Sequence, residues 1–225
     1  MKRITTILIL SFLSLSVFAQ NFNVQNFGFK LGLTATPTIG WIKPEQGKTE
    51  GVGLGFSYGI MGDFNFAPNY SFSTALTITT INGKSTEVNV WPYHASSSST
   101  NVPVAYDLKY KMQYIEIPLT VKLKTIKEDG KRWYGQFGLS NGFNISAKQD
   151  AVRNNTTVGD NQNISDFSKF YRAGLIIGGG GEFDISGNTS VLAGLTFNNG
   201  FTNIVKDGSR ESRNHYLALN FGIFF

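Results

Sequence analysis

The 225 residues suit a single domain, and their composition is typical of an all-β chain: aromatic residues make up 14%, charged residues only 16%, and glycines number 25. There is no cysteine, which excludes disulfides, thiolate metal sites and a lipid-modified N-terminal cysteine. The formal net charge is +5, but two of these charges lie within the first three residues. The other basic residues are scattered and partly interleaved with acids, so a nucleic-acid surface is not expected.

Residues 1–19 have the parts of a secretory signal peptide. Lys2 and Arg3 form a charged start, residues 4–18 form an apolar run, and Ala19 ends a small-residue cleavage site. The run is short for a membrane-spanning helix, and no later stretch approaches about 18 uninterrupted apolar residues. We therefore expect residues 1–19 to be removed and residues 20–225 to form one exported domain.

The exported chain contains eight segments in which apolar residues alternate with polar or small ones. Such a period of two is typical of strands whose two faces meet different surroundings. The pattern is clearest in the last segment, where one face is wholly apolar and the other holds small, polar or aromatic residues. The segments cover residues 27–37, 51–66, 70–79, 107–125, 133–145, 169–185, 191–198 and 214–225.

The connections between these segments alternate in length. The long ones cover residues 38–50, 82–106, 148–168 and 199–213, and the short ones cover 67–69, 126–131 and 186–189. All long connections therefore fall at one end of the strands. Bacterial outer-membrane barrels have short periplasmic turns and long external loops. We predict an eight-stranded antiparallel up-and-down transmembrane β-barrel of the outer-membrane type, with both termini in the periplasm and the apolar face toward lipid.

The segment 107–125 changes phase. Its apolar residues occupy even positions up to Tyr114 and odd positions from Ile115 onward. A slip of one residue sends every later side chain to the other face, so we predict a β-bulge near Tyr114 and Ile115. With that bulge, one polar face would contain Lys109, Lys111, Gln113, Glu116 and Lys122.

Three groups of residues have expected roles in such a barrel. An eight-stranded barrel is filled by its own side chains, and the inward charges should form an ion-paired network that seals it: Lys30, Asp63, Glu116, Lys122, Arg172 and Glu182. Aromatic girdles should mark the membrane surfaces: Phe66, Tyr70, Tyr110, Trp133 and Tyr171. The apolar face of the last strand should be read by the barrel-assembly machinery: Leu217, Leu219, Phe221, Ile223 and Phe225.

Candidate chemistry is sparse, and no catalytic, cofactor or metal residue is assigned. The run Gly178–Gly181 lies inside an alternating strand with no helix after it, so we interpret it as close backbone approach and not as a phosphate loop. The two histidines, His94 and His215, lie in different segments, so a metal site formed by both would need a chance approach of these segments. The carboxylates Glu116 and Glu182 are flanked by cations, which favours an interior salt-bridge network over a catalytic pair.

Three motifs carry a family resemblance. They are Tyr-Ile-Glu-Ile-Pro-Leu at 114–119, Gly-Gln-Phe-Gly at 135–138, and the terminal Phe225. In these the sequence resembles the PorT-type outer-membrane β-barrel proteins of Bacteroidota, over nearly the whole exported chain. The resemblance implies an eight-stranded outer-membrane barrel and, for the best-known member, a role in type IX secretion and gliding. It brings no catalytic residues.

Three hypotheses for function remain open. The favoured one is a non-enzymatic structural or accessory subunit of an outer-membrane complex, for type IX secretion or barrel assembly, whose partners are outer-membrane lipid and other proteins. The second is a surface binder or adhesin that uses loops 82–106 and 148–168. The third is an enzyme that modifies lipid, with Glu116, Glu182 and His215 as the residues to test. No cofactor is expected.

Overall fold

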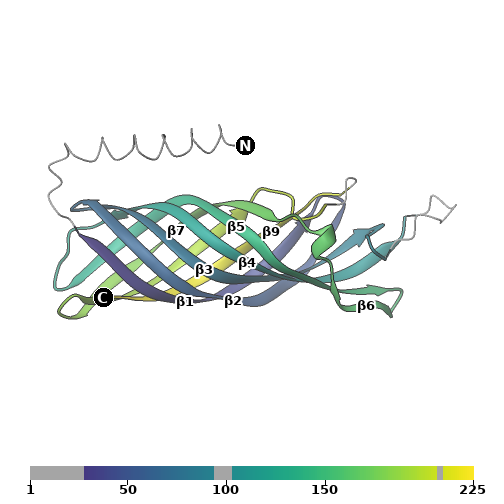
Figure 1. Cartoon of the computed structure of the whole chain (residues 1–225), viewed down its shortest axis with the longest axis horizontal. Helices are drawn as coiled ribbons and strands as arrows, with labels where there is room; N and C mark the ends of the chain where they lie inside the picture. The colour runs from purple at the N-terminus through teal and green to yellow at the C-terminus, as the bar shows by residue number, and fades with distance from the viewer. Residues whose placement is uncertain (1–27, 94–102, 207–209) are drawn as a thin grey trace, which may run out of the picture.

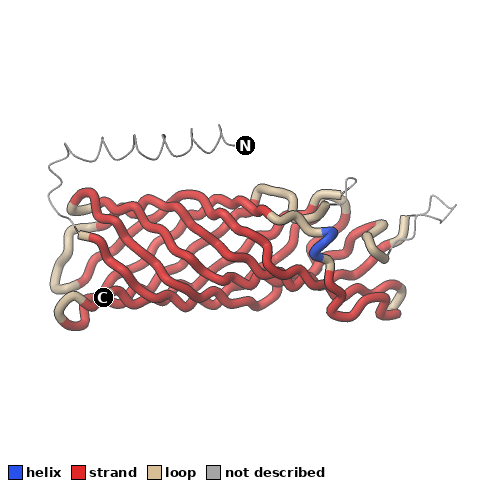
Figure 2. The backbone as a smooth tube through the Cα atoms, viewed as in Figure 1, coloured by secondary structure: helices blue, strands red, loops and turns tan. Residues whose placement is uncertain are grey.

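The computed structural model describes residues 28–93, 103–206 and 210–225, so the expected signal peptide and His94 lie outside the described residues. Almost the whole described chain is β-strand, with one short 3-10 helix, η1 (Ser165–Phe167) (Figure 2). The strands are β1 (Phe29–Pro44), β2 (Gly47–Ala67), β3 (Tyr70–Val88), β4 (Ala105–Lys124), β5 (Lys131–Arg153), β6 (Thr156–Asn163), β7 (Tyr171–Ser186), β8 (Thr189–Gly200) and β9 (Ser212–Phe224). The described residues contain no helix long and apolar enough to cross a bilayer.

Eight of these strands form a closed ring (Figure 1). The order is β1-β2-β3-β4-β5-β7-β8-β9, and every neighbouring pair is antiparallel. Pairing of β9 with β1 closes the ring, with Phe224 opposite Gly32 and Ser212 opposite Pro44. The predicted eight-stranded antiparallel barrel is therefore confirmed. The ninth strand, β6, pairs only with β5 and lies outside the ring.

The two ends of the ring differ in their connections, although the predicted long connection 38–50 is wrong, because β1 and β2 are separated only by residues 45 and 46. At one end, here called the turn end, short turns join β2 to β3, β4 to β5 and β7 to β8. The other end, called the loop end, carries the short β1–β2 turn, the three longer connections and a protruding sheet (Figure 1). This sheet, called the extension, consists of the loop-end parts of β3, β4 and β5 together with β6. The predicted loop 148–168 is wrong in its first part, because β5 continues to Arg153 and returns as β6.

The outward face of the ring is apolar over most of its length. Large side chains such as Leu33, Leu54 and Ile177 are exposed by 58%, 75% and 58%. Isolated exposed apolar side chains are common on proteins, but a continuous band of them around a ring is not. Such a band fits the hydrocarbon layer of a bilayer.

The alternation of β4 is unbroken, so the bulge predicted near Tyr114 and Ile115 of this strand is wrong. Its register against β3 is constant, and Tyr114 and Glu116 are both buried with half-buried Ile115 between them. What changes along β4 is the polarity of the faces. Beyond the apolar band the outward residues meet water and the inward ones meet an apolar core. Lys109, Lys111 and Gln113 therefore lie on the face opposite to Glu116 and Lys122.

The bulge lies in the neighbouring strand, β5. Gln113 pairs with Ser146 and Tyr114 pairs with Asn144, so Ile145 has no partner on β4. The inward positions of β5 are even before this point and odd after it. A bulge re-aims the side chains that follow it, and here it separates the ring part of β5 from its part in the extension.

Two inward glycines of β2 form a tight corner of the ring. A Cβ atom at Gly53 would lie 2.6 Å from backbone carbon of Asn82, and one at Gly55 would lie 2.1 Å from the Thr80 carbonyl oxygen. Across this corner the Thr38 hydroxyl of β1 donates to the same Thr80 oxygen of β3 at 3.1 Å. Because no side chain separates them, β1 and β3 approach each other directly, which narrows the loop-end half of the ring.

Candidate functional site

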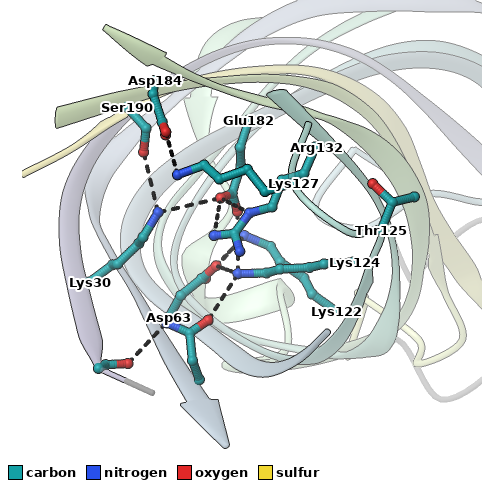
Figure 3. Close-up of polar contacts among 12 residues, drawn as sticks. Lys30, Asp63, Lys122, Lys124, Thr125, Lys127, Arg132, Glu182, Asp184 and Ser190 are labelled. Atoms are coloured by element: carbon teal, nitrogen blue, oxygen red, sulfur yellow. Dashed lines mark hydrogen bonds and ion pairs between the residues drawn. The ribbon is translucent and has the colours of Figure 1, made fainter. Parts of the chain in front are cut away.

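The interior next to the turn end holds a buried cluster of ion pairs, called the charged layer (Figure 3). Asp63 of β2 is fully buried and accepts hydrogen bonds from Lys122 at 3.0 Å through both carboxylate oxygens. Lys124 donates to it at 3.0 Å and Ser73 of β3 at 2.6 Å. Lys122 and Lys124 both belong to β4. Both side chains enter the lumen because residues two apart in a strand share a face.

The second carboxylate of the charged layer is Glu182 of β7. Arg132 of β5 donates to its Oε2 from Nε at 2.8 Å and from Nη2 at 2.6 Å. Lys124 lies 3.3 Å from Oε1, and Lys30 of β1 lies 3.5 Å from Oε2. Lys124 thus joins the two carboxylates (Figure 3). Such a buried network is costly to break, because removing one partner leaves a charge without compensation.

Cations outnumber carboxylates in the charged layer, and aromatic rings contact two of the cations. The ammonium of Lys122 lies 5.0 Å from the ring centre of Tyr134 and 5.4 Å from that of Phe224. Lys30 lies 5.6 Å from the ring centre of Phe224. These are cation–π distances, and they add attraction that two carboxylates alone do not supply.

Next to the charged layer, toward the loop end, lies a small cavity whose lining contains many hydroxyl groups among apolar side chains. Its volume is about 120 Å³. This is room for a group of waters, and it is well below the roughly 300–1,000 Å³ of a usual ligand pocket. The hydroxyl-bearing residues around it are Thr34, Thr36, Thr38, Ser57, Ser73, Thr74, Thr77, Thr120, Tyr134, Ser140, Thr196 and Tyr216.

The next layer is centred on Arg172 of β7, whose side chain is fully buried. Its Nη1 donates to Glu116 Oε1 at 3.1 Å, and its guanidinium lies 5.5 Å from the ring centre of Tyr216. Tyr216 donates to the other oxygen of Glu116 at 2.8 Å. The remaining guanidinium N–H groups donate to polar atoms of Ser140, Asn198 and Asn214. This arginine layer joins β4, β5, β7, β8 and β9 across the lumen.

The loop-end half of the interior is an apolar core with one buried acid. The core is formed by inward side chains of the strands and by residues of the loops above them, among them Ile81, Met112, Ile164 and Ile204. The acid is Glu87 of β3. It accepts hydrogen bonds from Ser85 at 2.7 Å, Tyr110 at 3.0 Å, Ser212 at 3.0 Å and Arg210 at 2.6 Å.

Two loops close the mouth at the loop end. The segment after η1 and the β8–β9 connection pair through an isolated bridge between Ser168 and Val205. The amide of Lys169 donates to the Ile204 oxygen at 2.9 Å, and that of Lys206 to the Phe167 oxygen at 2.8 Å. Val205 is buried in the core below, so the paired loops form a lid on it.

The residues predicted for the interior network all face the lumen, but in two separate layers. Lys30, Asp63, Lys122 and Glu182 belong to the charged layer, whereas Glu116 and Arg172 form the centre of the arginine layer. Five further residues of the interior networks were not predicted from the sequence. They are Lys124, Arg132, Tyr134, Glu87 and Arg210.

The predicted girdle residues divide between outward and inward positions. Phe66 and Tyr70 face outward with ring centres 6.2 Å apart, and Trp133 meets Phe183 edge to face at 6.0 Å, all near the turn end. Tyr171 is exposed by 43% nearer the loop end. Tyr110 does not belong to a girdle: it is 1% exposed, inside the loop-end core, because β4 has no bulge.

The C-terminal strand has the expected apolar outward face. The exposed fractions of its five predicted side chains lie between 37% and 59%. These residues are Leu217, Leu219, Phe221, Ile223 and Phe225.

The glycine run of β7 provides space for an aromatic ring. A Cβ atom at Gly180 would lie 2.7 Å from the hydroxyl oxygen of Tyr134, and one at Gly194 of β8 would lie 2.4 Å from the same atom. The run therefore allows close approach inside a narrow ring, as we interpreted it.

The three residues considered for lipid chemistry are not brought together. Glu116 and Glu182 lie in different interior layers. His215 stacks on Trp41 at 5.8 Å between ring centres, and Trp41 stacks on Phe197 at 5.9 Å. Within the described ranges, no group of three or more His, Cys, Asp and Glu side chains is arranged to hold a metal ion.

Comparisons with known proteins agree with this architecture. The sequence family described as "Outer membrane protein beta-barrel domain" matches residues 18–206. The chain belongs to this family. Membership places this outer-membrane β-barrel in the bacterial outer membrane. A search of curated proteins found no match.

Several solved structures are similar to this outer-membrane β-barrel at low sequence identity. Neisserial surface protein A (NspA) is 14% identical, with a TM-score of 0.48, over 88% of this chain and 97% of that one. OprG from Pseudomonas aeruginosa is 11% identical, with a TM-score of 0.45, over 88% and 96%. The attachment invasion locus protein Ail of Yersinia pestis is 13% identical, with a TM-score of 0.41, over 88% and 100%.

Proposed function

We propose that this protein is a sealed, non-enzymatic barrel that serves as a structural or accessory subunit of an outer-membrane complex. In this proposal both termini lie in the periplasm, the loop end faces the outside, and the C-terminal strand is read by the barrel-assembly machinery. The observation that supports it most is the filling of the lumen. The charged layer, the arginine layer and the apolar core with its lid succeed one another along the axis, and the cavity between the first two, about 120 Å³, is much smaller than a usual ligand pocket of roughly 300–1,000 Å³.

A finer form of the proposal is membership of the PorT type, with a role in type IX secretion. It is supported by the motifs at 114–119 and 135–138, and the structure gives these motifs a physical role. Glu116 of the first motif is the carboxylate of the arginine layer, and Gln136 of the second lines the cavity. Both motifs thus serve the sealed interior, which suits a barrel that works through its surfaces.

Purification from the native outer membrane in mild detergent tests the proposal. We expect partner proteins to elute with the barrel in fixed ratio, and we expect the purified barrel to give no ion conductance in a planar bilayer. A monomer without partners would contradict the role in a complex. Steady conductance would contradict the sealed lumen.

The orientation has its own test, because the chain contains no cysteine. Asn155→Cys lies at the tip of the β5–β6 hairpin at the loop end, and Asn188→Cys lies in the β7–β8 turn at the turn end. On whole cells, a membrane-impermeant maleimide should label the first variant and not the second. Labelling of only the second would reverse the proposed orientation.

A second function, surface binding, is favoured by the extension. The loop-end parts of β3, β4 and β5 stand beyond the ring together with β6 (Figure 1), and their outward side chains include Lys84, Lys109, Lys111 and Lys148. Replacing residues 149–163 by a short turn would remove the β5–β6 hairpin. If the extension is a binding surface, cells with this variant should lose the binding phenotype of the parent protein, although the variant still folds and inserts. An unchanged phenotype would remove this alternative.

A further inference from the structure

Aromatic rings and cations lie together in a hollow on the outer surface. It lies at the loop end, between the segment that enters β7 and the β8–β9 connection, and has a volume of about 680 Å³. Its lining is formed by three aromatic residues, three cations, one acid and two polar residues. They are Phe170, Tyr171 and Phe201; Lys169, Lys206 and Arg213; Glu211; and Thr202 and Asn203.

The hollow is held in shape by hydrogen bonds. The side chain of Asn203 accepts from the amides of Val205 and Ser212, both at 3.0 Å, and donates to the carbonyl oxygen of Arg210 at 3.1 Å. Thr202 accepts from the amide of Ala173 at 2.9 Å. The backbone pairing of the two loops, described above, brings Lys169 and Lys206 to the same hollow.

The charges of the hollow favour an anion. Among the described residues of the lining, Glu211 is the single acid, and it pairs with Arg213 at 3.1 Å. Neither Lys169 nor Lys206 forms an ion pair with another residue in the part of the chain that the structure describes. Two ammonium groups are therefore left to attract negative charge.

The aromatic rings add an apolar contact at the same place. Phe170 is 65% exposed and Phe201 50% exposed, and Phe143 of β5 packs against Phe170 with ring centres 5.7 Å apart. Toward the turn end the outward face of β7 continues with exposed Leu175 and Ile177. The hollow thus lies where the apolar band ends and polar surface begins.

We propose that this hollow binds a lipid whose headgroup carries phosphate. Lys169 and Lys206 bind the phosphate, and Phe170 and Phe201 pack against the upper part of the acyl chains. Basic residues at the surface of a membrane attract anionic headgroups, and aromatic side chains favour the boundary between headgroups and chains. A soluble anion would use the ammonium groups but would gain nothing from the exposed rings.

The test is native mass spectrometry of the folded full-length barrel in non-ionic detergent, with lipid A as the phosphorylated lipid. The variant Lys169→Gln/Lys206→Gln should bind lipid A on the order of tenfold more weakly than the parent protein. The matched control is Lys84→Gln/Lys148→Gln, which removes the same charge from exposed positions on the extension, away from the hollow. It should bind lipid A as the parent does.

Three outcomes would overturn the proposal. One is an equal loss of lipid A binding in both double variants, which would show general attraction by net charge. Another is equal binding of lipid A and of phosphate-free diacylglycerol. The third is displacement of lipid A by inorganic phosphate at equal concentration, which would indicate a site for a free anion. Phe170→Ser/Phe201→Ser should weaken lipid binding while both lysines remain. Heat-dependent gel mobility checks that each variant is folded.

Discussion

The turn-end half and the loop-end half of the barrel are built from the same strands, yet their faces have opposite polarity. Near the turn end β4 turns Leu119 outward and Lys122 inward; near the loop end it turns Lys109 outward and Leu108 inward. The strand geometry is the same throughout, so the surroundings outside the ring set the difference. Where hydrocarbon covers the outside, the interior is held by ions, and where water covers it, the interior is an ordinary apolar core.

The largest expected effect comes from breaking the charged layer. Asp63→Ala leaves Lys122 and Lys124 buried without their shared carboxylate, so the free energy of unfolding should fall by about 3–5 kcal/mol. Urea unfolding in lipid vesicles measures this. The control is Asp150→Ala on the extension, which removes a partly exposed partner of Lys111 and should cost less than about 1 kcal/mol. Equal losses of unfolding free energy in the two variants would mean that the charged layer is no more important for stability than an exposed ion pair of the extension.

The apolar core of the loop-end half should respond to a change of volume. Met112 is fully buried there, so Met112→Ala should lower the free energy of unfolding by about 2–5 kcal/mol. Thr36→Ala, which removes a hydroxyl beside the small cavity, should cost about 1 kcal/mol or less. The same urea experiment compares them. If Thr36→Ala proves the more costly, the stability of the loop-end half does not come from its core.

The outward face of β4 allows the surroundings to be tested within one strand. Leu119→Arg places a charge in the apolar band and should cost about 2–4 kcal/mol near the bilayer centre. Gln113→Arg lies on the same face, six positions nearer the loop end, and should cost about 0–1 kcal/mol. Folding yield into vesicles and urea unfolding measure both. Similar costs would mean that the apolar band extends past Gln113.

The smallest expected effect is the pH dependence of the extension. Burial alone would raise the pKa of Asp150, but hydrogen bonds from Lys111 and from the Asn161 amide outweigh it, so the pKa lies below its usual value. A lowered pKa in the folded state contributes stability that is present above the unfolded pKa of about 4 and is lost as the pH falls below it. Amide exchange at Asn161, compared with Asp150→Asn, should show a loss of about 1 kcal/mol or less at low pH. Identical pH profiles of amide exchange in the parent protein and in Asp150→Asn would contradict a contribution of the Asp150 carboxylate.

Much of the ring could be predicted from the alternation because one rule, apolar outward, holds throughout the band. The rule fails beyond the band, and the errors gather there. The girdle position predicted for Tyr110 and the bulge predicted in β4 are both wrong for this reason: the alternation of β4 is unbroken, and only the surroundings outside the ring change. The hairpin of β5 and β6 carries mostly polar residues on both faces, so no alternation marked it as strand.

The sequence could predict which residues of the candidate site face inward, but not which of them form ion pairs with one another. The same alternation that placed Lys122 inward also places Lys124 inward, and Arg132 shares its face with Tyr134; these residues could have been found. That Lys124 joins Asp63 to Glu182 could not, because it depends on the order and register of strands around the ring. The hollow near Lys169 and Lys206 depends in the same way on two loops meeting.

The seam between β1 and β9 sets the order of assembly. It joins residues 29–44 to residues 212–224, so one edge of the first strand stays unpaired until the last strand has been synthesised and inserted. Until then both strands present bare backbone donors and acceptors, which a bilayer interior does not tolerate and which invite pairing with other chains. Recognition of the C-terminal strand by the barrel-assembly machinery, as proposed above, would cover one of these two edges until β9 pairs with β1.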